Sequence, residues 1–241
     1  MDITFHELLF FLVIFIANTF EAMTGFAGTL LAMPASMILI GVDEAKTILN
    51  IIALITCSFI VFSNFKKINK KEFLKITSFM IVGVLLGLLL FDFLEAAILM
   101  KIYAVVIIAI ALKNMFVKTA VKQLPFFLSG AILLLAGVIH GMFLSGGSLL
   151  IIYAMIALRE KSEFRATLAA IWVVLDSGIL LNQFLQGYVT STVVSLTALA
   201  IIPLIIAIAL GNFLHKKMKQ EHFLKVTYVL LFISGITLFI K

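Results

Sequence analysis

Residues 20–34 read FEAMTGFAGTLLAMP and follow LLFFLVIFIANT (8–19), a run without a charged residue. Glu21 therefore lies deep in an apolar segment, where a carboxylate is unfavourable unless it is paired or protonated. The small residues of 24–29 would weaken an ordinary helix, because glycine adds backbone freedom. An acid followed by such a break is typical of a functional site inside a membrane.

The rest of the composition agrees with a membrane protein. The chain has 241 residues, of which 63% are hydrophobic and 12% charged, and its mean hydropathy is +1.25. A soluble domain of this length would need more polar surface. Backbone groups in lipid must be hydrogen-bonded within the segment, and the alternation typical of a barrel is absent, so we expect an all-α polytopic membrane protein.

Ten apolar segments can be delimited, which predicts eight to ten transmembrane helices. The second and seventh segments are short, so segments 1 and 2, or 6 and 7, are alternatively re-entrant hairpins. The segments are 5–23, 26–41, 44–64, 74–94, 98–116, 125–143, 146–158, 165–185, 190–212 and 222–240.

The loops carry a strong charge asymmetry. If the connections alternate between two sides, 15 of the 18 basic residues fall on one side, and only Lys46, Lys101 and Lys241 fall on the other. The positive-inside rule makes the first side cytoplasmic and places both termini outside. The start MDITFHELL lacks the basic residues of a cleaved signal peptide. We therefore expect a multi-pass protein of the plasma membrane, whose net charge of +6 reflects cytoplasmic loops and not a nucleic-acid partner.

The two halves of the sequence resemble each other. AMTGFAGTLL (22–31) aligns with GMFLSGGSLL (141–150) at a shift of 119 residues, and LFDFL (90–94) aligns with LGNFL (210–214) at a shift of 120. Five segments in each half give the halves opposite orientations, a common construction of secondary transporters. We predict one membrane domain made of two inverted repeats, 1–119 and 120–241.

Three ionisable residues are candidates for proton coupling: Glu21, His140 and Asp176. At the shift of 119 residues Glu21 aligns with His140, each just before a stretch of small residues. Ionisable groups inside a membrane mark ion pathways and proton relays. The alternative is that each is neutral and bonded to a neighbouring helix, with Asp176 a structural acceptor.

The two small-residue stretches, TGFAGT and LSGGS, are candidates for an anion site. If helices begin there inside the protein, their free N–H groups carry a partial positive charge and can bind an anion without Lys or Arg. The alternative is close helix packing through small residues. The candidate substrate-binding residues are Thr24, Gly25, Gly28, Thr29, Ser145, Gly146, Gly147, Ser148 and Asn50.

TGFAGTLLAMP and GMFLSGGSLL resemble the signatures of the sulfite exporter TauE/SafE family, also called the toluene-sulfonate uptake permease family. The size, the segmentation and the repeat extend this resemblance over nearly the whole chain. Two positions depart from it: Ala27 stands where many members have Gly, and Tyr153 replaces a second proline. The resemblance implies transport of small sulfur-containing anions such as sulfite, sulfonates or thiosulfate, driven by an ion gradient.

Our leading hypothesis is a secondary transporter of small anions coupled to protons. The alternatives are an integral membrane enzyme acting on lipid head groups with His140 and Asp176, and a passive anion channel. We expect no catalytic residues, no cofactor and no metal site, since the single Cys57 and four scattered histidines suit none. The expected partners are a small anion and the lipid bilayer, and the sequence is compatible with a homo-oligomer.

Overall fold

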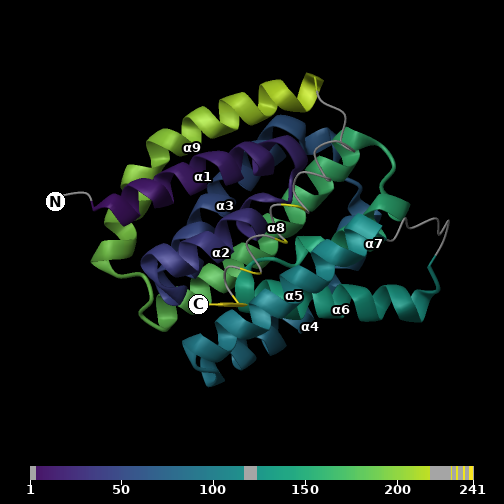
Figure 1. The fold of residues 1–241 in the computed structure, drawn as a ribbon. Coiled ribbons are helices and arrows are strands. Elements are labelled where there is room, and N and C mark those ends of the chain that lie inside the picture. Colours follow the sequence, from purple (N-terminus) through teal and green to yellow (C-terminus); the bar gives the residue numbers. More distant parts are fainter. Residues whose placement is uncertain are drawn as a thin grey trace.

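The computed structural model describes residues 4–116 and 124–217, together with Val229, Phe232, Ile236, Phe239 and Ile240. Within these residues the chain is helical and contains no strand (Figure 1). The helices are α1 (Phe5–Thr24), α2 (Gly28–Ile40), α3 (Val42–Asn64), the short 3-10 helix η1 (Phe65–Lys67), α4 (Lys70–Phe93), α5 (Ala96–Phe116), α6 (Phe126–Phe143), α7 (Gly147–Ala157), α8 (Lys161–Leu185) and α9 (Ser191–Lys217).

The prediction of an all-α polytopic membrane protein is confirmed. Within the described residues, six helices are long and apolar enough to cross a bilayer: α1, α3 with η1, α4, α6, α8 and α9. The helices α2 and α7 have only 13 and 11 residues, too short to cross a hydrocarbon core of about 30 Å. The tenth predicted segment, 222–240, and the predicted repeat boundary at 119/120 lie outside the described residues, apart from the five isolated positions.

Two helical hairpins are made by α1 with α2 and by α6 with α7; we call them the first and second hairpins. Gly25 (φ 85°) ends α1 and Leu144 (φ 54°) ends α6, both in the left-handed conformation. Each donates its backbone N–H to the carbonyl four residues earlier, at 2.7 Å to Glu21 and 2.8 Å to His140. The residues around each join, 24–29 and 144–148, are the first and second tips.

Most basic residues gather at one end of the bundle, which we call the basic end. There Asn69 donates to a Glu163 carboxylate oxygen at 2.7 Å, and the Lys161 ammonium donates to the backbone carbonyl of His215. These bonds join the start of α8 to the start of α4 and to the end of α9. The described basic residues of this end include Lys66, Lys67, Lys70, Lys71, Lys75, Lys161, Lys216 and Lys217.

The opposite end, which we call the acidic end, carries Glu7, Asp43, Glu44 and Asp92. One surface hollow there is lined jointly by the start of α1, the end of α2 and the starts of α3 and α9. The first hairpin therefore opens toward the acidic end. The second opens toward the basic end, where Lys75 donates to the Tyr153 hydroxyl of α7 at 2.7 Å.

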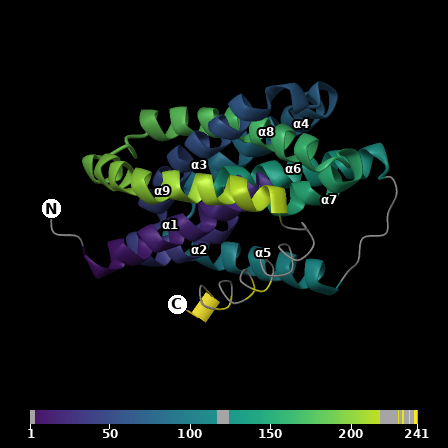
Figure 2. The ribbon, with the colours of Figure 1, turned by 90° about the horizontal axis from the view of Figure 1, so that it is seen from above.

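Helix packing fixes the longer arm of each hairpin. The helix α9 runs beside α1 (Figures 1 and 2), and α4 packs along α6 through glycines. A Cβ at Gly83 would lie 2.8 Å from the Cα of Gly137, and one at Gly87 would lie 3.1 Å from the Cα of Gly141. These four glycines let the two backbones touch, the usual role of such spacing in membranes.

Candidate functional site

The carboxylate of Glu21 caps the start of α2. Its Oε2 atom accepts a hydrogen bond from the Gly28 backbone N–H, and its Oε1 atom accepts one from the Cys57 thiol at 3.5 Å. The side chain is 2% exposed. A Cβ on Gly28 would lie 2.5 Å from Oε2 and 2.7 Å from the Cβ of Glu21, so only glycine leaves room for the acid. The N-terminus of α2 is thus already occupied by a carboxyl group of the chain itself.

The other candidates of the first tip bond to a carbonyl of α1, to α8 or to the second tip. The Thr24 hydroxyl donates to the Phe20 carbonyl at 2.8 Å, and the Gly25 carbonyl accepts from the Trp172 indole at 2.8 Å. The Thr29 hydroxyl donates to the Leu144 carbonyl at 2.5 Å. The Thr29 bond is a direct contact between the two tips.

His140 and Asp176 form a buried pair in the second half of the chain. Nε2 of His140 lies 2.7 Å from Oδ1 of Asp176, and the two side chains are 3% and 2% exposed. The imidazole stacks on Trp172 with a ring separation of 4.6 Å. Its Nδ1 atom is buried without a hydrogen-bond partner among the described residues.

The serines and glycines of the second tip are buried beside Tyr103 and the first tip. The Ser145 and Tyr103 hydroxyls are 2.6 Å apart, and the Ser148 hydroxyl donates to the Ser145 carbonyl at 2.9 Å. A Cβ at Gly147 would lie 3.1 Å from the Phe26 carbonyl, while one at Gly146 would lie 2.7 Å from the Cβ of His140. Both glycines therefore permit close packing at this tip.

Asn50 connects α3 to the buried face of α8. Its amide donates to the Gln183 side chain at 2.8 Å and to the Asp176 carbonyl at 3.2 Å. Its Oδ1 atom is buried without a partner among the described residues. The candidate residues therefore occupy one interior region. Glu21 lies close enough to Asp176 to interact electrostatically.

Comparison with protein-family models matches residues 10–238 to the family described as Sulfite exporter TauE/SafE. The chain belongs to the sulfite exporter TauE/SafE family. The match covers nearly the whole chain and confirms the resemblance seen in the two glycine-containing stretches. No match was found among curated proteins or among solved structures. The family is one of membrane transporters, so the buried tips are the candidate transport site of this TauE/SafE member.

Two residues of this site were not predicted as functional. The Cys57 thiol donates a hydrogen bond to Glu21, and the Trp172 ring stacks on the His140 ring. A sequence signal existed for both, because Cys57 precedes Asp176 by the same 119 residues that separate Glu21 from His140, and Trp172 lies one helical turn before Asp176.

The Tyr103 hydroxyl lies beside the carbonyl that a proline in α2 deprives of its helical donor. Pro34 has no N–H, so the Leu30 carbonyl lacks its usual donor four residues later. The buried Tyr103 hydroxyl lies 3.5 Å from that carbonyl and also contacts Ser145. At the corresponding position of α7, Tyr153 has an N–H, and its hydroxyl instead donates to Glu72 at 2.6 Å.

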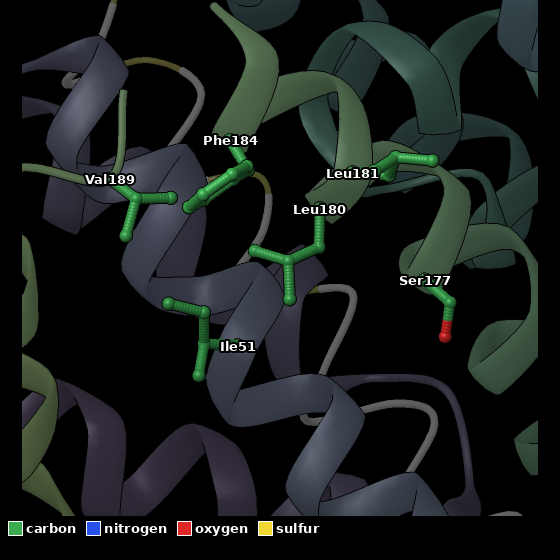
Figure 3. Close-up of a pocket in the computed structure, with 6 residues that line it drawn as sticks. All are labelled: Ile51, Ser177, Leu180, Leu181, Phe184 and Val189. Atoms are coloured by element: carbon green, nitrogen blue, oxygen red, sulfur yellow. The ribbon is translucent and has the colours of Figure 1, made fainter. Parts of the chain in front are cut away.

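A separate apolar hollow lies between α3 and α8 (Figure 3). Its volume is about 430 Å³, and it is lined by Ile51, Ser177, Leu180, Leu181, Phe184 and Val189. The Leu181 and Phe184 side chains are 61% and 67% exposed. The Ser177 hydroxyl donates to its own helix, at the Val173 carbonyl. A surface with no charged group and large exposed apolar side chains suits lipid chains better than an anion.

Proposed function

We propose that this TauE/SafE member is a secondary transporter that moves a small sulfur-containing anion, such as sulfite, a sulfonate or thiosulfate, together with protons. The substrate site is the interior where the two tips meet. The observation that carries this proposal is a pair of equivalent contacts: Glu21 bonds to Cys57, and 119 residues later His140 bonds to Asp176.

The equivalent contacts support an inverted repeat with boundaries near 119/120. Gly25 and Leu144 are also 119 residues apart, and both are the left-handed residues that end the first arm of a hairpin. The two hairpins open toward opposite ends of the bundle. Two similar units of opposite orientation around one central site are the usual basis of alternating access. The positive-inside rule makes the basic end cytoplasmic, with both termini outside the plasma membrane.

The contact of Glu21 with Gly28 suggests how an anion and a proton are coupled. While Glu21 is ionised, its carboxylate accepts the hydrogen bond of the Gly28 N–H at the start of α2, so this N–H is not free to bind a substrate. Protonation removes the negative charge, weakens this bond and leaves the N–H free for an oxyanion. The neutral acid also no longer repels the substrate. Anion binding and proton binding therefore favour each other, as symport requires.

The second tip provides a polar surface and a second proton site. Ser145 and Ser148 supply hydroxyls, and Gly146 and Gly147 allow close approach of the backbone. The His140–Asp176 pair is enclosed at 3% and 2% exposure, so a proton taken up there is shared between two groups shielded from water. We assign proton coupling to Glu21 and to this pair, and substrate contact to the two tips and Asn50.

Flux measurements in proteoliposomes test this function. We expect sulfite or a related anion to accumulate when a pH gradient is imposed, and Glu21→Gln to remove the dependence on that gradient, because an amide cannot carry the proton. Glu44→Gln, which removes an acid at the acidic end, is the matched control and should retain coupling. Accumulation in Glu21→Gln equal to that of the unaltered protein would exclude Glu21 from coupling.

The same preparation distinguishes a transporter from a channel. A passive channel equilibrates the anion and cannot accumulate it against its gradient. Thermal unfolding of the purified protein with sulfite, sulfate, thiosulfate, sulfonates and carboxylates would identify the substrate, since a ligand that binds only the folded state raises Tm. If no sulfur-containing anion is transported and none raises Tm, the proposed function is wrong.

A further inference from the structure

One buried basic side chain lies near each end of the bundle at equivalent positions. Lys46 is the fifth residue of α3, and Arg165 is the fifth residue of α8. They are 119 residues apart and are 3% and 5% exposed. A buried cation is strongly unfavourable unless it is compensated, so the neighbours of each one are informative.

At the acidic end the charge of Lys46 is compensated by acids. Its Nζ atom lies 3.3 Å from the ring centroid of Phe91, and Asp43 and Asp92 interact with it electrostatically. The space among these side chains is about 10 Å³, roughly enough for one water molecule. Lys46 is thus held in a closed cluster with two carboxylates and an aromatic ring.

At the basic end the partner of Arg165 is a neutral amide. Its guanidinium donates from Nη2 to the Asn212 side-chain oxygen, and its Nε atom is buried without a partner among the described residues. Asn212 stands where the aligned stretch LFDFL has Asp92. The electrostatic interaction of Lys46 with Asp92 is therefore replaced by an uncharged hydrogen bond at Arg165.

Basic and acidic groups both lie around Arg165. Lys161 and His215 lie close enough to interact with it electrostatically. The nearby acids have other bonds: Glu160 accepts from the N–H groups of Ser162 and Glu163, which lower the pKa of its carboxyl. Cys57 and Glu21 also interact with Arg165 electrostatically, and Glu21 bonds directly to Gly28. Glu163 in turn accepts from Asn69 at 2.7 Å.

We infer that Arg165, with Asn212 beside it, is the site at which the oxyanion is captured from the basic end before it reaches the tips. This inference rests on the proposed function. A guanidinium with an unused donor matches a tetrahedral or pyramidal oxyanion well, because it presents several N–H groups in a fixed plane. Arg165 also adjoins the first tip: a Cβ on Gly25 would lie 2.9 Å from the Arg165 carbonyl and 3.2 Å from its Cγ.

The difference between Asn212 and Asp92 gives the site its sidedness. At the basic end the missing acid is supplied by the substrate, whereas at the acidic end Asp92 and Asp43 already occupy that role for Lys46. The anion is therefore bound more tightly when the site is open to the basic end. With that end in the cytoplasm, this arrangement gives the cytoplasmic face the higher affinity for the substrate.

Exchanging the two side chains tests this inference. Asn212→Asp should raise the KM for sulfite added at the basic end at least tenfold, because the new carboxylate pairs with Arg165 in place of the anion. Asp92→Asn changes the same chemistry at the other end and should leave that KM unchanged. Vesicles that hold the protein in either orientation allow the KM to be measured separately at the basic end and at the acidic end. The Tm of each purified variant shows whether it folds.

A second variant covers the case in which Asn212→Asp does not fold. Arg165→Lys keeps the charge but loses the planar fork, and should raise the same KM several-fold. A basic-end KM within twofold of the unaltered protein in any folded variant of Asn212 or Arg165 would overturn the inference. In that event transport by the unaltered protein would still support the proposed function, whereas its absence for every sulfur-containing anion would remove both.

Discussion

At the scale of single residues, Glu21 and Gly28, seven positions later, act as one unit. Glu21 is buried, and its carboxylate is satisfied by the first N–H group of α2 and by Cys57. A negative group at a helix N-terminus is stabilised by the unpaired N–H groups and by the helix dipole. The glycine is needed for space, because any larger residue at position 28 would collide with the carboxylate.

Gly28→Ala tests this unit. The added methyl group must displace the Glu21 side chain, so we expect a loss of about 1–3 kcal/mol of stability and a large loss of coupled transport. Gly178→Ala is the control, since nothing lies within 4 Å of a Cβ at Gly178. Tm in detergent and proton-driven flux are the measurements. Equal Tm and flux in Gly28→Ala and the unaltered protein would mean that the carboxylate does not depend on this close approach.

At the scale of helices, α4 and α6 are held together by glycines on both sides. Lipid tails are as apolar as leucine, so association of helices in a membrane relies on close packing. Gly83 and Gly87 of α4 lie against Gly137 and Gly141 of α6 with backbone atoms in contact. This packing fixes the long arm of the second hairpin, and thereby the position of His140.

Gly83→Val should separate these helices. A side chain at this position meets the backbone of Leu134, Gly137 and Val138, which cannot move without shifting α6. We expect a fall in stability of at least about 1–3 kcal/mol, measured as Tm, together with reduced transport. Leu89→Val is a suitable control because Leu89 is 57% exposed. A Tm equal to that of the control would contradict the packing role.

At the scale of the whole molecule, the two hairpins enter the bundle from opposite ends and meet at their tips. The Thr29 hydroxyl bonds to the Leu144 carbonyl, and Gly147 lies against Phe26. Both hairpins also contact α8, the first through the bond of Gly25 with Trp172 and the second through the bond of His140 with Asp176. The sites of the two halves are therefore parts of one interior region, and a shift of either hairpin alters the contacts of the other.

Thr29→Val removes the bond between the tips while keeping the size of the side chain. The Leu144 carbonyl would then lose a buried donor, and we expect a loss of about 1–3 kcal/mol, seen as a lower Tm. Thr29→Ser retains the hydroxyl and should behave much like the unaltered protein. If Thr29→Val and Thr29→Ser have the same Tm, the hydrogen bond between the tips does not stabilise the fold.

The helices and their breaks follow from the sequence because hydropathy and backbone propensity are local. The predicted segments agree with α1 to α9 to within a few residues, apart from a start four residues earlier in α4 and α8 and an end five residues later in α9. The burial of Glu21, His140 and Asp176 followed from the lack of nearby charges in their segments. Their partners did not follow, since the faces that touch depend on how helices distant in sequence cross.

By itself, the sequence of this protein determined a helical membrane fold, the residues at which two helices break, and which loops are basic. Only the tertiary structure decided that Glu21 occupies the N-terminus of α2, that Asp176 belongs to His140, and that Arg165 has a neutral partner where Lys46 has acids. The physical reason is that transfer into lipid is a property of each segment alone. The compensation of a buried charge, by contrast, depends on atoms that neighbouring helices bring to it.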